Sequence, residues 1–192
     1  GDRVALLTTR GFGDLQIIGN QSRPKIFDLE IRRPDLLYET VVEIDERVIL
    51  VTGDMQVSAA KAAGYELVTG VSRELLYVEQ ALDVTAVEKS LQAVYDSGIR
   101  SVAVCLLHAY TFTTHEKEIK SIAQKLGFTQ VSISCEVMPM IRAVPRGCTT
   151  CVDAYLTPVI KRYLANFSSG FDAGLADVQV SFMQRDGGLT PI

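Results

Sequence analysis

The chain has 192 residues, which is enough to form the core of one good-sized domain, or of one domain and part of a second. Its hydrophobic fraction of 47% and charged fraction of 22% are typical of a globular protein. Its net charge of −4 comes from 23 acidic and 19 basic residues interspersed along the chain, and without a basic stripe we expect no nucleic-acid partner. No apolar run approaches the roughly 18 residues of a membrane span, and the chain starts without a secretory signal, so we expect a cytoplasmic protein with no membrane partner.

The sequence begins with a strand and a short helix. Residues 3–8 form an apolar run rich in β-formers that predicts a buried strand, which Gly11-Phe12-Gly13 ends. Phe12, Leu15 and Ile18 then share one helical face, and Gly19-Asn20 is a stop signal, so a short helix is predicted between them.

The next stretch has weaker patterns. Residues 21–34 predict an ordered loop, and residues 38–50 predict a hairpin whose two Val/Ile-rich strands are split by Asp45-Glu46. Residues 53–72 carry little pattern, and we predict a mobile or inserted segment there.

The middle of the chain predicts two helix–strand units. Two pairs have the S/T-x-x-E spacing of a capping box: Thr85 with Glu88, and Thr113 with Glu116. Apolar residues with helical period follow each pair until Gly98 or Gly127 ends the helix, and an apolar strand comes next, at residues 101–107 and 131–135. This order predicts a parallel sheet with right-handed crossovers.

The last part of the chain predicts a loop at residues 144–147 and a helix at 149–167, which Pro158 should kink. Residues 178–182 alternate as a strand that ends at the turn Asp186-Gly187-Gly188.

A domain boundary is expected within residues 147–176, where the kinked helix would link two lobes. We therefore assign residues 1–147 to one region and 148–192 to the start of a second. The first residue is not Met and the last follows a turn signal, so both ends are expected to be cut.

The four cysteines are expected to be reduced thiols, because the chain has no secretory signal. Cys148-x-x-Cys151 has the spacing of a zinc or redox pair. A structural zinc needs two further ligands at a comparable spacing, so local packing at a helix start is the favoured interpretation.

Two histidines flank a polar loop at the end of the strand 101–107, the edge where open α/β sheets bind ligands. In one interpretation His108 caps the strand and His115 lies in the first turn of the next helix. In the other, both join Glu116 in a metal site of two histidines and one carboxylate.

Glu136, Arg142 and Arg146 follow the second strand. Guanidinium groups match carboxylates and phosphates, so this cluster suits an anionic ligand, and the alternative is an ion-pair network that fixes the loop. Arg23 with Lys25 raises the same choice, between an anion site and a solvated loop.

Two glycine pairs have some features of phosphate sites. Gly11-x-Gly13 lacks the third glycine of a dinucleotide fingerprint, because Gln16 stands in its place, which excludes a Rossmann site. Asp186-Gly187-Gly188 brings backbone N–H groups to a phosphate or forms a tight turn.

Stretches in one order along nearly the whole chain resemble the N-terminal half of the 5-oxoprolinases and the related ATP-dependent hydantoinases. The first block consists of Arg3–Phe12, Asp14-Leu15 with Ile18–Pro24, Phe27–Leu29 and Ile44–Arg47. The second consists of Cys105–His108 with Tyr110, His115-Glu116, Glu136–Gly147, Asp153–Pro158 with Tyr163, and Met183 with Asp186–Leu189. Gly13 and Arg185 differ from the Arg and Ser common at those positions of the family.

The resemblance implies an α/β fold, part of an actin/Hsp70-like (ribonuclease H-like) ATPase with a mixed or parallel sheet and βα units, whose lobes close on Mg-ATP. It also implies that 5-oxo-L-proline, water and ATP give L-glutamate, ADP and phosphate, in the glutathione cycle, by an enzyme that is a homodimer when complete. A lactam is resonance-stabilised, and phosphorylation of its oxygen would let water attack. The family's two glycine-rich phosphate loops are absent from this chain, so we expect it to be inactive alone.

Among the matched positions, we expect three groups of site residues. We expect His108 and Glu136 to handle protons, and the anionic groups of the substrate to be bound by Arg23, Arg142 and Arg146. The nucleotide is expected to contact Asp186, Gly187 and Gly188, and no residue is expected to bind a metal. Two alternatives stay open, a fragment of an N-methylhydantoinase or acetone carboxylase-type subunit, and a non-catalytic binding module.

Overall fold

The computed structural model describes all residues except 21–26, 28, 31–34, 172–179, 184–186 and 192. The predicted loop at 21–34 therefore lies almost wholly outside the described residues, as does the start of the predicted strand at 178–182. The chain divides into two compact units, residues 1–158 and 159–192. In the described parts of the chain, no helix combines the length and the apolar character needed to cross a membrane.

The first unit is built on a four-stranded sheet in which every neighbouring pair is parallel, in the order β2-β1-β6-β7. Its strands are β1 (Val4–Thr9), β2 (Thr40–Ile44), β6 (Ser101–Cys105) and β7 (Gln130–Ile133). Every residue of β1 and β6 is buried, because these central strands are covered on both faces, as their continuous apolar runs predicted. The parallel sheet and its βα units confirm the predicted fold class.

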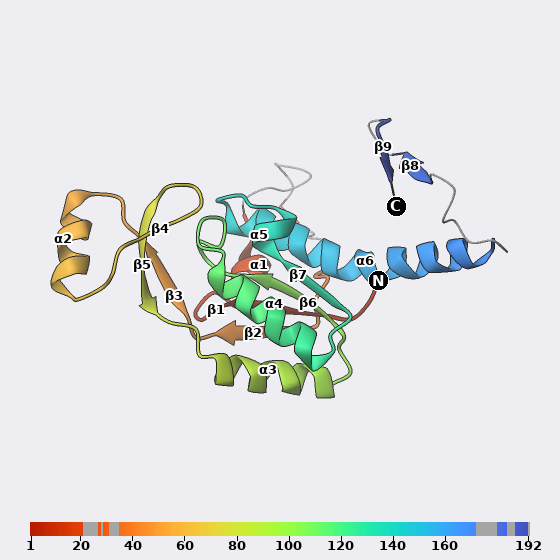
Figure 1. The fold of residues 1–192 in the computed structure, drawn as a ribbon, viewed down its shortest axis with the longest axis horizontal. Coiled ribbons are helices and arrows are strands. Elements are labelled where there is room, and N and C mark those ends of the chain that lie inside the picture. Colours follow the sequence, from red (N-terminus) through yellow and green to blue (C-terminus); the bar gives the residue numbers. More distant parts are fainter. Residues whose placement is uncertain (21–26, 28, 31–34, 172–179, 184–186, 192) are drawn as a thin grey trace. The chain divides into compact units, whose positions relative to one another are not determined.

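Alternate residues of the central strands feed two separate apolar clusters, since successive side chains of a strand point to opposite faces. Ala5 and Leu7 pack in the cluster that contains residues of α3 (Val84–Asp96) and α4 (Thr114–Leu126). Val4 and Leu6 pack with residues from the first half of α6 (Ala143–Ser169). The sheet is thus the middle of three layers, with α3 and α4 on one face and the first half of α6 on the other (Figure 1).

The start of α3 shows which cap the sequence encodes. Asp83 has the extended backbone of an N-cap, and its carboxylate accepts the Ala86 N–H at 3.0 Å. Thr85 already lies inside the first turn, so the predicted capping box of Thr85 and Glu88 is wrong.

The second predicted capping box is wrong as well. Thr113 is the N-cap of α4, but its side chain makes no capping hydrogen bond, and Glu116 is instead buried at the end of the sheet. Both helices end where the sequence predicted: Gly98 has a φ of 87° and Gly127 a φ of 95°, in the left-handed region that glycine tolerates.

Residues 38–50 do not form the predicted hairpin. β2 joins the main sheet, whereas β3 (Arg47–Leu50) pairs antiparallel with β5 (Leu75–Gln80) in a second sheet. The two residues between β2 and β3 therefore carry the chain from one sheet to the other. Glu46 explains the difference, because its carboxylate is buried against other polar side chains instead of lying in an exposed turn.

Residues 53–72, predicted as a mobile or inserted segment, contain α2 (Asp54–Ala62) and β4 (Val68–Thr69), so regular structure occurs where the sequence pattern is weak. β4 completes the second sheet, in the order β3-β5-β4. The pattern is weak because α2 buries only Ala60 and so needs no apolar stripe.

The predicted loop at residues 144–147 is wrong, because these residues form the beginning of α6. Pro145 is compatible with this position, since the first N–H groups of a helix have no acceptor within it. The predicted helix boundaries elsewhere shift less: α1 covers Leu15–Ile18, and α5 (Ser134–Val137) takes up the end of the predicted strand 131–135.

The second unit holds the remainder of α6, beyond Pro158, and a two-stranded antiparallel sheet of β8 (Ser181–Met183) and β9 (Leu189–Pro191). The predicted turn Asp186-Gly187-Gly188 falls between these two strands in the sequence, and its Asp186 lies outside the described residues. The assignment of residues 1–147 and 148–192 to two family regions stays a prediction.

Candidate functional site

Arg146 lies fully buried beside the end of β6. Its Nη1 donates to Ser134 Oγ and its Nη2 to the Leu106 carbonyl, both at 2.8 Å. Its Nε is buried and has no hydrogen-bond partner among the described atoms. Since burial of a guanidinium requires such partners, the structure ties Arg146 to the protein itself, and its predicted role in binding an anionic substrate group stays a prediction.

Glu116 is the acidic counterpart of Arg146 and is also fully buried. Its Oε1 accepts the Leu106 N–H at 2.9 Å and the Ser134 hydroxyl at 2.6 Å, and its Oε2 accepts the Cys135 N–H at 2.8 Å. Burial raises the pKa of this carboxyl, although these hydrogen bonds and the charge of Arg146 act in the opposite direction. The Ser134 hydroxyl bridges the two charged groups, because it accepts from Arg146 and donates to Glu116.

A second buried group lies at the ends of β1 and β2. His115 Nδ1 and Glu46 Oε2 are 2.9 Å apart, and the Thr9 hydroxyl donates to Glu46 Oε1. The same Thr9 oxygen accepts the Leu107 N–H at 3.0 Å. The backbone just after β6 is therefore bonded to side chains of both groups.

His108 follows directly and has a φ of 57°, in the left-handed region. Its carbonyl accepts the N–H groups of Thr111 and Phe112, at 3.0 and 2.9 Å, which closes the turn. The ring is half-buried, and burial, with a smaller contribution from the charge of Arg146, lowers the pKa of the imidazole. A neutral imidazole at pH 7 is able to accept a proton.

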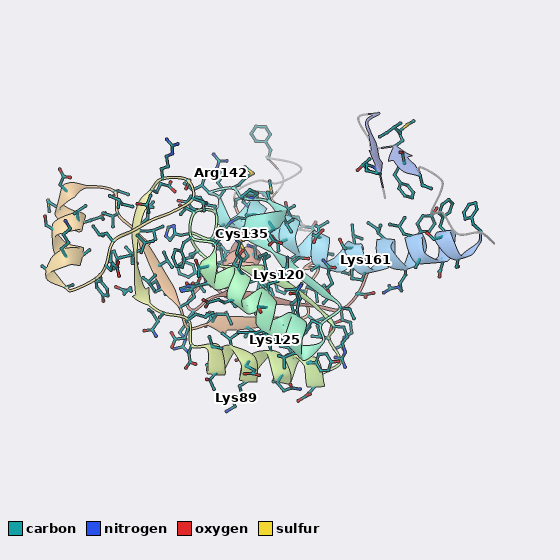
Figure 2. All side chains as sticks on the ribbon, in the orientation of Figure 1. Lys89, Lys120, Lys125, Cys135, Arg142 and Lys161 are labelled. Carbon is teal, nitrogen blue, oxygen red and sulfur yellow. The ribbon has the colours of Figure 1, made fainter. Side chains whose placement is uncertain are left out.

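The other predicted site residues are dispersed. Glu136, in α5, forms an ion pair with Lys120 at 2.5 Å and is about half exposed, at 48%. Arg142, which precedes α6, is exposed (Figure 2). Arg23 and Asp186 lie outside the described residues, and Gly187 and Gly188 are exposed in the second unit. Of the predicted site residues that the structure describes, His108 and Arg146 are the two that lie together, at the end of β6.

The alternative metal site of His108, His115 and Glu116 does not form. His115 is paired with Glu46, while both carboxylate oxygens of Glu116 are bonded to Leu106, Ser134 and Cys135. Across the residues that the structure describes, no three His, Cys, Asp or Glu side chains are grouped so as to hold a metal ion.

All four cysteines are free thiols, as predicted. Burial raises the pKa of Cys105 to about 11 and those of Cys135 and Cys151 to about 12. Cys151 is buried in the apolar cluster under α6, and Cys148 donates to Gln16 Oε1 at 3.3 Å. Raised thiol pKa values oppose thiolate formation. Of the CxxC pair, Cys151 is packed in the apolar cluster and Cys148 is exposed.

The loop after β1 offers backbone donors, but a side chain of the protein uses them. The N–H groups of Gly11 and Gly13 both donate to Glu43 Oε1, at 3.1 and 3.0 Å. A Cβ at position 13 would lie 2.9 Å from the same oxygen, so the carboxylate fits closely against the glycine backbone. This small anion site is filled by Glu43.

A cavity of about 660 Å³ lies between α1, residues 35–38 and the first half of α6. Its walls are mostly apolar, and both Cys148 and Cys151 line it. None of the predicted site residues that the structure describes contributes to its lining, so the cavity and the polar edge are separate features.

Sequence reasoning misses three members of the buried groups. It gives Thr9 no function, and it makes Glu46 a turn residue and Ser134 an ordinary strand residue. Only the sheet register, which brings the ends of β1, β6 and β7 together, gives them a role.

Comparison with known protein families places nearly the whole chain. The family model of the hydantoinase/oxoprolinase N-terminal region matches residues 1–127, and the hydantoinase/oxoprolinase model matches residues 146–192. The chain is 47% identical to a 5-oxoprolinase of Dictyostelium discoideum and 49% identical to 5-oxoprolinase 1 of Arabidopsis thaliana, in both cases over its full length. It spans about 15% of the length of these relatives.

Two solved structures share the fold over the whole chain. ATP-dependent caprolactamase from Pseudomonas jessenii superposes with a TM-score of 0.73 at 24% identity, and the chain covers 25% of it. Acetone carboxylase in its nucleotide-free form superposes with a TM-score of 0.71 at 16% identity, and the chain covers 26% of it. The N-terminal family model covers most of this chain, and the alignments to 5-oxoprolinases cover all of it, so the chain belongs to the hydantoinase/oxoprolinase family.

Proposed function

We propose that this chain is part of an ATP-dependent 5-oxoprolinase, a cytoplasmic hydrolase of glutathione metabolism that converts 5-oxo-L-proline to L-glutamate and is a homodimer when complete. The observation that carries the proposal is the identity of 47% and 49% to relatives named 5-oxoprolinase, each aligned over the full chain. The named caprolactamase and acetone carboxylase structures, at 24% and 16% identity, support only the fold.

The described residues do not fit a nucleotide site by themselves. The N–H groups of Gly11 and Gly13 are bonded to Glu43. Gly187, with a φ of 84°, has open space where a Cβ would be, but a single exposed backbone N–H is no cradle for three phosphates. ATP and Mg²⁺ would therefore bind in the complete enzyme, where ATP would supply the phosphoryl group that activates the lactam.

The roles of the chain's own residues follow from their surroundings. His108 is the proposed proton acceptor, because it is half-buried at a sheet edge and its lowered pKa keeps it neutral. Glu136 is the proposed second proton-handling group, and it would first have to leave Lys120. The exposed Arg142 is better placed for an anionic substrate group than Arg146, and Arg23 keeps the same proposed role.

The test is a chimera of Arabidopsis thaliana 5-oxoprolinase 1 in which this chain replaces the stretch that it matches. The expected result is release of glutamate that requires both ATP and 5-oxoproline. Hydantoin and caprolactam are the comparison substrates. A folded chimera that turns over either of these faster than 5-oxoproline would contradict the proposed substrate.

The isolated chain gives a second measurement, with glutamate release assayed under the same conditions. No turnover is expected, since the chain spans only about 15% of its relatives. The chimera carrying His108→Asn is expected to lose most of its turnover while keeping its melting temperature. Full activity in that variant would remove His108 from the proposed mechanism without affecting the proposed substrate.

A further inference from the structure

His108 has a backbone conformation that its own residue type does not favour. Of the described residues other than glycine, it shares a positive φ only with Arg73, at 57° and 67°. Arg73 lies in the exposed turn between β4 and β5, where local turn geometry accounts for it. His108 instead follows a fully buried strand, and such conformations persist where the surrounding structure enforces them.

The enforcement comes from side chains. The ladder of β6 ends at Cys105, which is opposite Thr8 of β1, and beyond it no neighbouring strand pairs with Leu106 or Leu107. Three hydrogen bonds take over: Glu116 accepts the Leu106 N–H, Arg146 donates to the Leu106 carbonyl, and Thr9 accepts the Leu107 N–H. These side chains come from α4, α6 and β1, so three elements converge on the two residues before His108.

The arrangement of Glu116 and Arg146 suits holding the backbone before His108 better than it suits binding a ligand. Both are fully buried, and the Ser134 hydroxyl joins them at 2.6 and 2.8 Å. Two opposite charges without access to water are costly unless their hydrogen bonds are satisfied by fixed groups. Here those fixed groups are mainly the backbone of Leu106 and the hydroxyl of Ser134, so the charge pair stays intact only when the backbone before His108 keeps this position.

We propose that Glu116 and Arg146 are positioning residues, which, bridged by Ser134, hold the backbone before His108 so that its imidazole is presented from a left-handed turn at the end of β6. The use of that imidazole in the reaction rests on the proposed function. The positioning itself does not, because it concerns contacts within this chain.

The test uses NMR on the full chain, which has only two histidines. The backbone ¹³C shifts and the HN–Hα coupling of His108 report its left-handed conformation, and His115 is the internal reference. Glu116→Gln keeps the shape of the side chain, but its single carbonyl oxygen can accept from only one of the two backbone donors, and its amide N–H group is set against the other, the N–H of Leu106 or of Cys135. Glu118→Gln is the matched control, since Glu118 is exposed on the same helix.

In the wild type, left-handed signals for His108 are expected. In Glu116→Gln these signals should be lost, and the Leu106 and Leu107 amide hydrogens should exchange at least about tenfold faster, while Glu118→Gln matches the wild type. A wild-type His108 with ordinary helical or extended shifts, or a folded Glu116→Gln variant with unchanged His108 signals, overturns the proposal.

If Glu116→Gln does not fold, Ser134→Ala decides, because it removes only the bridging hydroxyl. A displaced His108 signal with an unshifted His115 signal supports the proposal, and two unshifted signals, or a second failure to fold, overturn it. The chimera with Ser134→Ala then separates the two questions. A displaced His108 with undiminished glutamate release would leave the positioning intact and contradict the catalytic use of His108.

Discussion

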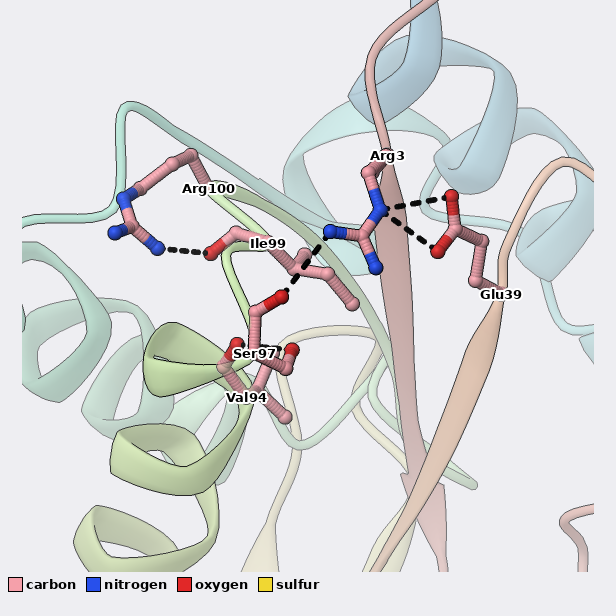
Figure 3. Close-up of polar contacts among 6 residues, drawn as sticks. All are labelled: Arg3, Glu39, Val94, Ser97, Ile99 and Arg100. Carbon is pink, nitrogen blue, oxygen red and sulfur yellow. Dashed lines mark hydrogen bonds and ion pairs between the residues drawn. The ribbon is translucent and has the colours of Figure 1, made fainter.

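The strands of the main sheet are parallel, so all of them begin at one side of the sheet, its amino edge, and end at the opposite side, its carboxyl edge. Each of these edges carries an arginine that ties several elements together, but the two arginines lie in different surroundings. At the amino edge, Arg3 Nε donates to both carboxylate oxygens of Glu39, at 3.1 and 2.8 Å, and Nη1 donates to the Ser97 carbonyl at 3.1 Å (Figure 3). The side chain of Arg3 is 54% exposed, whereas Arg146 at the carboxyl edge is 0% exposed. Water replaces lost partners only at the first edge, so similar hydrogen bonds should differ several-fold in their effect on stability.

The largest effect is expected at Arg146. Arg146→Met leaves the charge of Glu116 and the Leu106 carbonyl buried without their partner, so the free energy of unfolding should fall by about 3–5 kcal/mol. Arg142→Met changes the same residue type just before α6, at an exposed position, and should stay within about 0.5 kcal/mol of the wild type. Urea denaturation followed by circular dichroism measures both, and equal losses would remove the distinction between buried and exposed arginines.

The next effect concerns the dependence of stability on pH. The pKa of Glu116 is raised above its ordinary value of 4.5, so above that pH the folded state keeps a proton that the unfolded state has released. The free energy of unfolding should therefore fall as the pH rises from 4.5 through the raised pKa, by about 1.4 kcal/mol for each pH unit between the pKa values of the unfolded and folded states.

Glu116→Gln should lack this fall, and the exposed Glu118→Gln should keep it. Urea denaturation at a series of pH values gives the comparison. A Glu116→Gln variant that follows the wild-type curve would show that another group is responsible.

A smaller effect separates the two predicted capping boxes. Asp83→Ala removes the acceptor of the Ala86 N–H at an exposed helix start, and should lower the free energy of unfolding by about 1 kcal/mol. Thr113→Ala should cost markedly less, because the Thr113 side chain makes no capping hydrogen bond. Thermal denaturation of both variants tests this order, and a larger loss for Thr113→Ala would reverse it.

Much of the fold was predictable from local pattern. The buried strands at Val4–Thr9 and Ser101–Cys105, and the glycines that end α3 and α4, follow from apolar runs and from the conformational freedom of glycine. What could not be predicted depends on contacts distant in sequence. Glu46 resembles a turn residue until His115, 69 positions later, is brought against it.

The candidate site divides in the same way. His108 was found because it follows a recognisable strand, and its placement at the carboxyl edge is a local inference. Whether a charged residue near that edge faces solvent depends on packing, and the sequence has no signal that separates Glu136 from Glu116 or Arg142 from Arg146. Burial is set by the register of β1, β6 and β7, which only the assembled sheet defines.

The smallest effect is expected at the amino edge. Arg3→Met removes the ion pair with Glu39 and the bond to the Ser97 carbonyl, but water can solvate both groups, so the loss should not exceed about 1 kcal/mol. It should shrink further in about 1 M salt, where exposed charges are screened within about 3 Å. Lys89→Met, an exposed change on α3, corrects for the general effect of removing one positive charge. If Arg3→Met costs as much as Arg146→Met, exposure does not decide what these arginines contribute, and the contrast between the two edges fails.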